Sequence, residues 1–484
     1  MRAAIFVEPD GDLVVEDVKP TDPGPRDVVV NISASGVCHS DLSVINGTLP
    51  MPPPAILGHE GTGVVESVGS EVSGLKPGDR VVGSFIPACG DCWFCNNGQS
   101  NLCEATYAVM ATPRATRSDG TPLPTMTGLG TFADSMTCDV MSLVKVETDL
   151  PDEELALIGC GVTTGVGAAL NTAQVVPGST VAVVGCGGVG QAVVQGAKIA
   201  GAARIIAVDP VELKRKTALQ LGATDTIDPS AGDPVAQVQA LTSGRGADYA
   251  FEVIGNPATI REAFDMTRAG GTCVAVGVPR FDQSIELPSM PLILQEKRIL
   301  GTVYGSAQVN RDFPRLIALV EQGRLDLGDM VSRKMGLNDI NDAFKAMQAG
   351  EVIRSVIQRR SRRDRVEPFR QAPGGPARPL GVGGEPAADH RLEPIGTGVL
   401  RDVTAQRLDL AVEGVRHVDE PGRARRRGHH PDLVHGPRLK VLVVEQLRVG
   451  ERVSRVGVHR AEHRLARRQV VGVAGEDPLV VPLG

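Results

Sequence analysis

The stretch Thr180-Val-Ala-Val-Val-Gly-Cys-Gly-Gly-Val-Gly190 decides the fold of the central part of this chain. Residues 180–184 form a short apolar run, which is long enough only for a buried parallel strand. Gly185-x-Gly187-x-x-Gly190 follows directly, and helical spacing of apolar residues continues over 189–200. The sequence therefore predicts a strand, a tight glycine turn and a helix, in that order.

The three glycines of this turn have separate roles. Gly185 makes the tight turn, Gly187 lets the backbone approach a pyrophosphate, and Gly190 permits close packing of the helix on the strand. The phosphates then lie at the helix N-terminus, where free N–H groups and the helix dipole favour anions. Asp209 follows the next apolar run, where a carboxylate accepts hydrogen bonds from the ribose hydroxyls of NAD and repels the 2′-phosphate of NADP. We therefore expect NAD as the cofactor.

The alternation of strand and helix continues downstream. Short apolar runs recur at Arg204–Val208, Tyr249–Val253 and Thr272–Val276. Four such units predict a doubly wound α/β sheet. Between residues 310 and 350, apolar side chains at helical spacing predict two more helices.

The N-terminal part follows a different pattern. Short runs such as Ala3–Val7 and Asp27–Asn31 alternate apolar and polar residues, and Pro-Gly and Asp-Gly turns separate them. Val64–Val68 and Asp79–Gly83 continue this pattern. Because glycine is frequent here, we expect a β-rich opening of the kind found in a small, strongly bent barrel.

Four cysteines, Cys89, Cys92, Cys95 and Cys103, lie within one short segment. Two-residue gaps let successive thiolates converge on one tetrahedral zinc ion, with Zn–S distances of about 2.3 Å. Four thiolates fill the metal's shell, which makes this a structural site. The alternatives are cysteines without metal, disulfides, or an iron–sulfur cluster, whose cysteine runs usually come with a Cys-Pro pair.

Histidine is scarce in residues 1–358, which contain only His39 and His59. They stand in Gly-Val-Cys38-His39-Ser-Asp and in Gly-His59-Glu. A single histidine is ordinarily a hydrogen-bonded core side chain, but these two are framed by glycines and lie next to Cys, Asp and Glu. With Cys160 as a second thiolate, Cys38 and His59 form a Cys₂His set with one open position, the pattern of a catalytic zinc that oxidises alcohols.

The chain divides by charge near residue 358. The whole chain has a net charge of −7. Residues 359–484 carry 24 Lys and Arg against 16 Asp and Glu, which leaves 26 against 41 for residues 1–358. The C-terminal stretch is rich in Arg, Gly, Pro and Val without an amphipathic period, which favours disorder, and its composition also fits GC-rich DNA translated out of frame.

The motifs of residues 1–358 resemble the zinc-containing medium-chain alcohol dehydrogenase family. They occur in family order: Gly-Val-Cys-His-Ser-Asp, Gly-His-Glu, the four-cysteine lobe, Gly-Cys-Gly-Val-Thr-Thr-Gly and the dinucleotide fingerprint. The resemblance implies a β-rich GroES-like catalytic domain and a Rossmann cofactor domain. It divides the chain into a catalytic domain at 1–161 and 304–358, with the zinc lobe at 89–103, a cofactor domain at 162–303 and a tail at 359–484.

The resemblance also assigns roles to single residues. It implies that Cys38, His59 and Cys160 bind the catalytic zinc, with Asp41 and Glu60 behind them steering His59 and tuning the metal. It implies that Ser40 takes the substrate proton first and that His39 faces the cofactor pyrophosphate. Ser43 stands where many members have a histidine that passes the proton outward, so the later proton relay stays open.

Two basic residues complete the implied cofactor site. Lys214 corresponds to a second ribose contact and Arg354 to a pyrophosphate contact, and the alternative for both is a solvated helix charge. The resemblance places apolar residues around the substrate, which indicates primary or aromatic alcohols: Leu49, Phe85, Met126, Val278 and Val303.

Other functions remain open from the sequence. One is a formaldehyde dehydrogenase acting on a thiol adduct, although residues 42–57 lack the acidic anchors of that branch. Another is an enzyme that keeps NAD permanently bound and recycles it with a second substrate. A third is a nucleic-acid-binding protein, which the acidic body and the tail without stacking aromatics disfavour.

We expect a small-molecule alcohol or aldehyde as the substrate, and neither nucleic acid nor a membrane as a partner. No apolar run approaches the roughly 20 residues needed to span a bilayer, and the start of the chain lacks a signal-peptide pattern, so the expected location is cytoplasmic. The long segment between Cys103 and Phe132 favours a homodimer.

Overall fold

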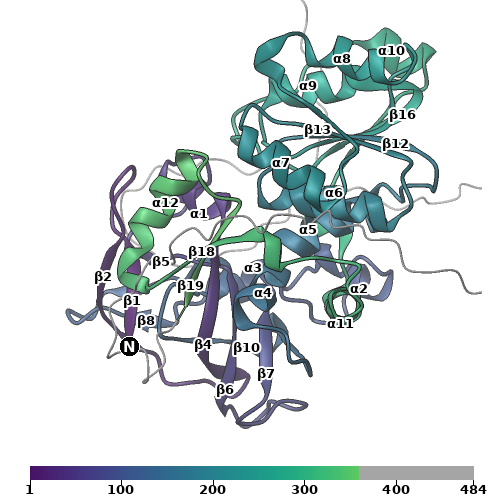
Figure 1. Cartoon of the computed structure of the whole chain (residues 1–484). Coiled ribbons are helices and arrows are strands. Elements are labelled where there is room, and N and C mark those ends of the chain that lie inside the picture. Colours follow the sequence, from purple (N-terminus) through teal and green to yellow (C-terminus); the bar gives the residue numbers. More distant parts are fainter. Residues whose placement is uncertain (359–484) are drawn as a thin grey trace, which may run out of the picture. The chain divides into compact units, whose positions relative to one another are not determined.

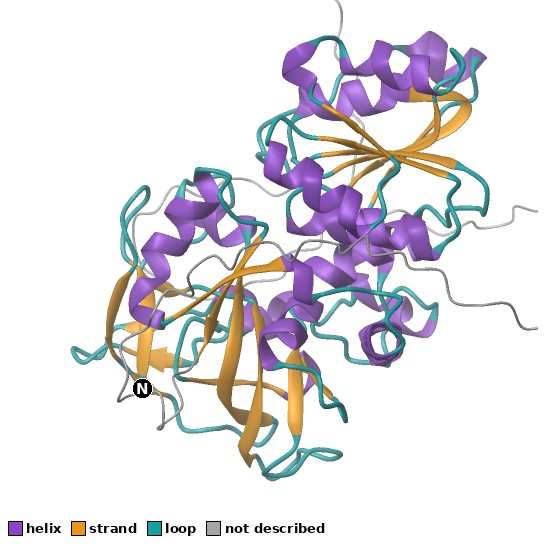
Figure 2. Cartoon of the chain, viewed as in Figure 1, coloured by secondary structure: helices purple, strands orange, loops and turns teal. Residues whose placement is uncertain are grey.

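The computed structural model describes residues 1–358, and the expectations for residues 359–484 lie outside the described residues. The described part contains two main sheets, one built mostly from the N-terminal strands and one from the middle of the chain (Figures 1 and 2).

The N-terminal strands confirm the predicted β-rich opening. The larger sheet has the order β11-β7-β6-β4-β19-β18, with β10 paired to β4, and two three-stranded sheets, β2-β1-β5 and β3-β8-β9, complete this part. The strands are β1 (Arg2–Phe6), β2 (Val14–Asp17), β3 (Lys19–Pro20), β4 (Asp27–Val37), β5 (Ala55–Ile56), β6 (Glu60–Val68), β7 (Arg80–Gly83), β8 (Ala115–Thr116), β9 (Pro122–Leu123), β10 (Ser135–Asp139), β11 (Leu143–Lys145), β18 (Val331–Met335) and β19 (Arg354–Gln358). The last two strands return to this sheet from the C-terminal end of the described chain.

The middle of the chain forms a six-stranded parallel sheet with the order β14-β13-β12-β15-β16-β17. Its strands are β12 (Thr180–Val184), β13 (Arg204–Val208), β14 (Asp225–Ile227), β15 (Ala247–Glu252), β16 (Thr267–Ala275) and β17 (Arg298–Gly301). The four predicted strands are confirmed. The two edge strands, β14 and β17, were not predicted, because they are short and lack a continuous apolar run.

Helices cover both faces of the parallel sheet, with α6 and α7 on one side and α8 and α9 on the other (Figure 1). The strand order reverses beside β12, and in sheets of this kind ligands bind at the carboxyl ends of the strands next to that point. The helices are α1 (His39–Ile45), α2 (Trp93–Asn96), α3 (Thr106–Met110), α4 (Asp152–Leu157), α5 (Thr163–Gly167), α6 (Gly188–Ile199), α7 (Glu212–Leu221), α8 (Pro234–Leu241), α9 (Pro257–Met266), α10 (Ser289–Leu294), α11 (Val309–Glu321) and α12 (Ile340–Gln348).

The two helices predicted between residues 310 and 350 are confirmed as α11 and α12. Their apolar stripes face the interior, as their spacing requires. In α12, Ile340 and Phe344 are buried, and the Phe344 ring packs edge-on against Phe132, with 6.2 Å between the ring centroids. This contact attaches α12 to the N-terminal strands.

A continuous helix spans Asp152–Thr172 and joins the two main sheets in sequence. Acidic side chains in its first turn favour a helix N-terminus, because they complement the helix dipole. The expectation that no stretch approaches membrane-spanning length is wrong here, since this helix is long and apolar enough. However, 78% of its most apolar window is buried inside the protein, as in a core helix.

Candidate active site and metal centres

Strand register brings Cys38 and His59 together. Cys38 follows β4 directly and His59 precedes β6 directly, and these antiparallel strands pair Gly36 with Glu60. Because antiparallel strands place the end of one beside the start of the other, two residues far apart in sequence become neighbours. Only glycine fits at position 58, between Leu57 and His59. Gly58 has a φ of +92°, and a Cβ there would lie 2.6 Å from the backbone nitrogen of Phe132.

Asp41 holds the turn that carries Cys38 and the turn that carries His59 with one buried carboxylate. Its Oδ2 accepts a hydrogen bond from the Cys38 backbone N–H at 3.0 Å, and its Oδ1 accepts one from Gly58 N–H at 3.0 Å. His59 Nδ1 lies 3.1 Å from the same Oδ1. An Nδ1–H donated to this carboxylate leaves Nε2 as the ring's lone-pair nitrogen, which is the arrangement that fixes a metal-binding histidine.

Cys160 comes from the long helix, in a π-helical turn at Ile158–Val162. Such turns widen a helix locally and are frequent at functional sites. The ligand atoms of Cys38, His59, Glu60 and Cys160 all lie within 4.8 Å of one another, and all four residues are buried. The structure therefore brings together the three predicted ligands, and it adds Glu60 at a distance from which a carboxylate oxygen reaches the same ion.

These residues fit a zinc ion. His59 Nε2 is buried and has no hydrogen-bond partner among residues 1–358, although a buried polar nitrogen normally has one. The hydrogen bond between the thiols lowers the pKa of Cys38 well below its ordinary value and raises the pKa of Cys160. The two sulfurs and one nitrogen are a ligand set that zinc favours, and the thiolate is the form that binds metal.

Glu60 and Arg354 form a buried ion pair beside this cluster. Arg354 Nη2 donates to Glu60 Oε2, and Glu60 Oε1 accepts from the Gly161 backbone N–H at 3.2 Å. Burial raises the pKa of Glu60 to about 7, although Arg354 opposes that shift. The hydrogen bonds of Glu60 therefore go to Arg354 and to the π-helical turn of Cys160 rather than to His59.

Ser40 and His39 lie at the start of α1. The Cys38 sulfur and the Ser40 hydroxyl oxygen are 3.8 Å apart, so this hydroxyl lies beside a predicted metal ligand. His39 is exposed, and Ser43 is buried on the same helix. Their predicted roles, a pyrophosphate contact for His39 and a relay for Ser43, stay predictions.

The predicted substrate residues have different surroundings. Phe85 packs edge-on against the His59 ring, with 5.7 Å between the centroids. Met126 is buried and Leu49 is half-buried, and both belong to one apolar cluster with Leu57 and Phe132. Val278 and Val303, which follow strands of the parallel sheet, are 61% and 41% exposed.

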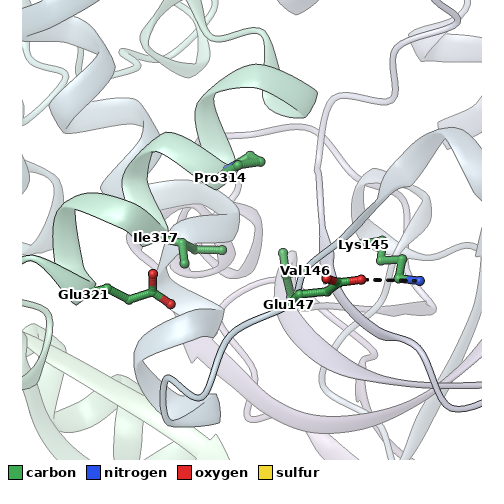
Figure 3. Close-up of a pocket in the computed structure, with 6 residues that line it drawn as sticks. All are labelled: Lys145, Val146, Glu147, Pro314, Ile317 and Glu321. Atoms are coloured by element: carbon green, nitrogen blue, oxygen red, sulfur yellow. Dashed lines mark ion pairs between the residues drawn. The ribbon is translucent and has the colours of Figure 1, made fainter.

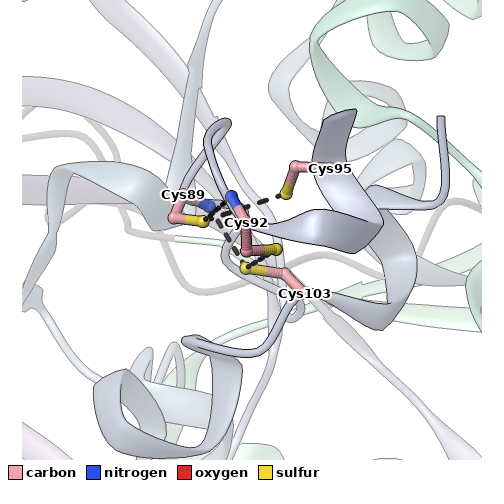
Figure 4. A group of neighbouring side chains, drawn as sticks. All are labelled: Cys89, Cys92, Cys95 and Cys103. Atoms are coloured by element: carbon pink, nitrogen blue, oxygen red, sulfur yellow. Dashed lines mark hydrogen bonds between the residues drawn. The ribbon is translucent and has the colours of Figure 1, made fainter. Parts of the chain in front are cut away.

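The four cysteines of the lobe converge on a second centre (Figure 4). The sulfurs of Cys89 and Cys95 are 4.0 Å apart, as are those of Cys92 and Cys103. A tetrahedral zinc with Zn–S distances of about 2.3 Å places its sulfurs about 3.8 Å apart. Backbone N–H groups of Cys95 and Glu104 lower the pKa of Cys92 to about 6, which favours the thiolate. All four cysteines are free rather than paired in disulfides.

The predicted dinucleotide turn follows β12 and opens α6. Gly185 has a φ of +91°, and a Cβ on Gly190 would lie 2.0 Å from the Gly185 carbonyl oxygen. Nothing lies within 4 Å of the place that a Cβ on Gly187 would occupy, so the turn leaves open space in front of the helix. This is the cradle that a pyrophosphate requires, and a nicotinamide dinucleotide fits these residues.

Asp209 stands at the end of β13 beside this turn. Its carboxylate accepts hydrogen bonds from the backbone N–H groups of Cys186 and Val211, both at 2.8 Å. Lys214 is half-buried in α7, and its carbonyl oxygen accepts a hydrogen bond from the Gln191 side chain. The structure thus connects Asp209 to the glycine turn, whereas Lys214 keeps only its predicted role.

Arg354 lies between the metal cluster and the glycine turn. A Cβ on Gly188 would lie 2.2 Å from Arg354 Cδ, and one on Gly161 would lie 2.6 Å from Nη1. The buried Arg354 Nε has no hydrogen-bond partner among the described residues. The alternative interpretation of Arg354 as a solvated helix charge is wrong, since it begins β19 and is only 3% exposed.

A cavity elsewhere in the described chain is separate from these centres. It lies between the end of β11 and α11, where Lys145 and Glu147 form an ion pair (Figure 3). None of the predicted site residues lines it, because its walls are Lys145, Val146, Glu147, Pro314, Ile317 and Glu321.

Comparisons with known proteins agree with this arrangement. The family of alcohol dehydrogenase GroES-like domains matches residues 24–148, and the family of zinc-binding dehydrogenases matches residues 188–322. An NDMA-dependent alcohol dehydrogenase of Amycolatopsis methanolica is 39% identical over 364 residues, which cover 74% of this chain and 98% of that protein.

Solved structures show the same fold. Benzyl alcohol dehydrogenase from Acinetobacter calcoaceticus matches with a TM-score of 0.69 and 33% identity, over 74% of this chain and 98% of that one. A zinc-binding dehydrogenase from Sinorhizobium meliloti 1021, in a structure with bound NADP, matches with a TM-score of 0.63 and 29% identity, over 74% and 99% of the two chains.

The chain belongs to the zinc-containing medium-chain alcohol dehydrogenase family. It is an enzyme, a zinc-dependent alcohol dehydrogenase with a GroES-like part and a Rossmann-type part.

Proposed function

We propose that this enzyme binds two zinc ions per chain and oxidises alcohols to aldehydes or ketones, reversibly, with transfer of hydride to NAD. The observation that carries the proposal is the buried cluster of Cys38, His59 and Cys160, in which His59 Nε2 has no partner among residues 1–358. Cys89, Cys92, Cys95 and Cys103 would hold the second, structural ion.

The chain's own residues have distinct tasks in this reaction. A zinc ion held by Cys38, His59 and Cys160 supplies a Lewis acid that lowers the pKa of an alcohol. Asp41 orients His59, and the Ser40 hydroxyl oxygen takes the proton of the substrate hydroxyl while it passes its own proton on to solvent. Phe85 packs against His59 and offers an apolar surface to the carbon chain of the alcohol.

NAD is the proposed cofactor, although a structural neighbour was solved with NADP. Support comes from the buried carboxylate of Asp209, which is fixed by two backbone N–H groups beside the glycine turn. A fixed negative charge at this place repels a 2′-phosphate and accepts ribose hydroxyls.

We further propose that residues 1–161 and 304–358 form the catalytic domain and residues 162–303 the cofactor domain. The return of β18 and β19 to the sheet of β4 supports this division. The zinc lobe 89–103 belongs to the catalytic domain in this division.

A homodimer is the proposed assembly. Strand β17 is one of the two edge strands of the parallel sheet, with no further strand beside it among residues 1–358, and an edge strand presents N–H and C=O groups that can pair with another strand. Exposed apolar side chains lie on α10 and β17, among them Ile293, Leu294 and Leu300. A second copy of the same chain would cover both features by antiparallel pairing across a two-fold axis.

Metal analysis combined with two variants tests the proposed centres. We expect two zinc ions per wild-type chain. Each variant, Cys160→Ser and Cys95→Ser, should bind one zinc ion per chain, and Cys160→Ser should also lose alcohol oxidation. The assay is NAD reduction over short, long and aromatic alcohols. Alcohol oxidation at the wild-type rate by protein stripped of metal would contradict the proposal.

A second candidate is a nicotinoprotein, an enzyme that keeps its NAD bound. The NDMA-dependent relative favours it, because its name states that the enzyme depends on a further compound, NDMA. Denaturing the purified enzyme distinguishes the two candidates. Release of about one equivalent of NAD per chain, together with alcohol oxidation that added NAD does not stimulate, would support the second candidate. Addition of a thiol cofactor together with formaldehyde tests the thiol-adduct activity, which the uncharged segment 42–57 disfavours.

A further inference from the structure

Tyr304 occupies an unusual position between the parallel sheet and the metal cluster. It lies three residues beyond the end of β17, on the segment that leaves the parallel sheet. Although its side chain is large, only 2% of it is exposed. None of the sequence motifs contains Tyr304, so its role could not be predicted from them.

The Tyr304 hydroxyl reaches the π-helical turn that carries a proposed zinc ligand. It donates a hydrogen bond to the carbonyl oxygen of Gly159, the residue directly before Cys160. It also lies near the Ser84 side chain and the Phe85 backbone. One phenol group thus connects the segment after β17 with two segments beside the cluster.

The Tyr304 ring contacts the other side of the same cluster. It packs on Phe85, with 4.1 Å between the ring centroids and an interplanar angle of 44°. Phe85 in turn meets the His59 ring edge-on at 5.7 Å. The ring therefore supports His59 through Phe85, while the hydroxyl supports the π-helical turn of Cys160.

The backbone of this segment is strained in a way that its surroundings maintain. Tyr304, Gly305 and Ser306 have φ values of 57°, 62° and 49°, which is a left-handed turn that aromatic residues rarely adopt. Such conformations persist where neighbouring contacts fix them, and they cluster at functional sites.

The neighbouring contacts come from the long helix. The Asn171 side chain donates to the Gly305 carbonyl oxygen at 3.2 Å, and the hydroxyls of Thr172 and Ser306 are 2.8 Å apart. A Cβ on Gly305 would lie 2.5 Å from the Thr163 carbonyl oxygen, so the turn lies directly against the helix that carries Cys160.

We propose that Tyr304 is a positioning residue for the catalytic metal, which holds the π-helical turn of Gly159 and Cys160 through its hydroxyl and His59 through Phe85. The proposal rests on the proposed function, because it requires a zinc ion at Cys38, His59 and Cys160. If the proposal holds, the geometry of the metal centre depends on the segment that follows β17. It therefore also depends on the parallel sheet, which carries the glycine turn.

Tyr304→Phe isolates the hydroxyl, because it keeps the ring and removes only the donor to Gly159. The chain has three tyrosines, and Tyr249→Phe on β15 removes a hydroxyl of the same kind from a strand of the parallel sheet. The full chain is first loaded with zinc, and Co²⁺ then replaces zinc at the catalytic site. Two quantities are measured: the ligand-field absorption of Co²⁺ and the rate at which dipicolinate removes the catalytic metal.

We expect Tyr304→Phe to shift the Co²⁺ absorption bands and to lose the catalytic metal roughly tenfold faster, as is typical when a group behind a ligand is removed. Tyr249→Phe should match the wild type in both measurements. An unchanged spectrum and an unchanged loss rate in Tyr304→Phe would overturn the proposal, even with a lowered melting temperature. If the wild type takes up no metal at Cys38, His59 and Cys160, it is the proposed function that fails.

Hydrogen exchange of the wild-type chain gives a second test that needs no variant. Because coupling between two sites is reciprocal, metal at Cys160 should slow amide exchange in residues 302–307. Exchange in residues 247–252, which contain Tyr249, should stay the same. Equal exchange of residues 302–307 with and without catalytic metal would also overturn the proposal.

Discussion

At the scale of single residues, one buried carboxylate organises the cluster around His59 and another organises the glycine turn. Asp41 accepts hydrogen bonds from the turns of Cys38 and Gly58 and fixes the His59 ring. Asp209 accepts hydrogen bonds from the glycine turn and from the turn at Val211. Charge-assisted hydrogen bonds are stronger than neutral ones, which explains how a single side chain holds two turns in place.

The charge of Asp209 leads to a prediction about cofactor choice. Asp209→Asn keeps an acceptor oxygen but removes the charge, so the preference for NAD over NADP should fall. A like-charge contact costs several kcal/mol, and each 1.4 kcal/mol is a factor of ten, so we expect the ratio of kcat/KM values to fall roughly a hundredfold. Steady-state kinetics with both cofactors measures this ratio.

Asp228→Asn is the matched control, because this more exposed aspartate pairs with Arg215 and follows β14 directly, at the same end of the parallel sheet as Asp209 after β13. It should leave the ratio near the wild-type value. A ratio in Asp209→Asn equal to that of the control would show that the charge of Asp209 does not select the cofactor.

At the scale of elements, α11 is tied to the long helix by Asp312. This carboxylate accepts hydrogen bonds from the Arg311 guanidinium at 2.7 and 2.9 Å and from the Gln308 backbone N–H at 2.9 Å. It also accepts one from Asn171 at 3.3 Å. Asp312 therefore completes the N-terminal turn of α11, which is also where a negative charge is favoured by the helix dipole.

Asp312 predicts a pH dependence of stability. Burial alone would raise the pKa of Asp312, but Arg311, Gln308 and Arg315 outweigh it and lower the pKa below its ordinary value of 3.8. The folded state then binds this proton more weakly than the unfolded state, so stability is gained above pH 3.8 and lost as the pH falls below it. Asp312→Asn should lower the free energy of unfolding by about 2 kcal/mol at pH 7.

Urea unfolding of the wild type and the variant between pH 3 and pH 7 measures this difference, which should shrink toward zero at the acidic end. Asp329→Asn, on an exposed turn, should match the wild type throughout. A difference that stays constant with pH would mean that Asp312 acts through packing rather than through its charge.

At the scale of the whole molecule, the β17 edge of the parallel sheet predicts the assembly. Leu294→Glu places a charge on a side chain that is 70% exposed at the proposed dimer interface. Because like charges would then face each other across a two-fold axis, we expect the variant to sediment as a monomer. Val14→Glu, on the edge strand β2 of another sheet, should keep the wild-type sedimentation. Dimers of unchanged stability in Leu294→Glu would contradict the proposed interface.

The C-terminal stretch leads to a second prediction at this scale. All assigned site residues lie in residues 1–358, so a chain ending at residue 358 should keep its zinc content and its kcat with alcohols. Metal analysis and steady-state kinetics of the truncated and full chains measure this. Loss of nucleic-acid binding together with unchanged dehydrogenase activity would assign a separate role to residues 359–484.

The sequence by itself determined the local parts of this protein. The glycine turn after β12 and the closely spaced cysteines of the lobe are built from neighbouring residues, and spacing fixes the geometry of such sites. The scarcity of histidine also singled out His59, because residues 1–358 contain only one other. These parts could be predicted since their contacts span few residues.

Only the tertiary structure decided how these parts meet. Glu60 and Arg354 are 294 residues apart and Tyr304 and Gly159 are 145 apart, so no local pattern indicates either contact. The π-helical turn of Cys160 and the short edge strands β14 and β17 were also missed, because their apolar residues show no clear period. The physical reason is that strand register and helix packing bring distant residues together, and these depend on the whole folded core.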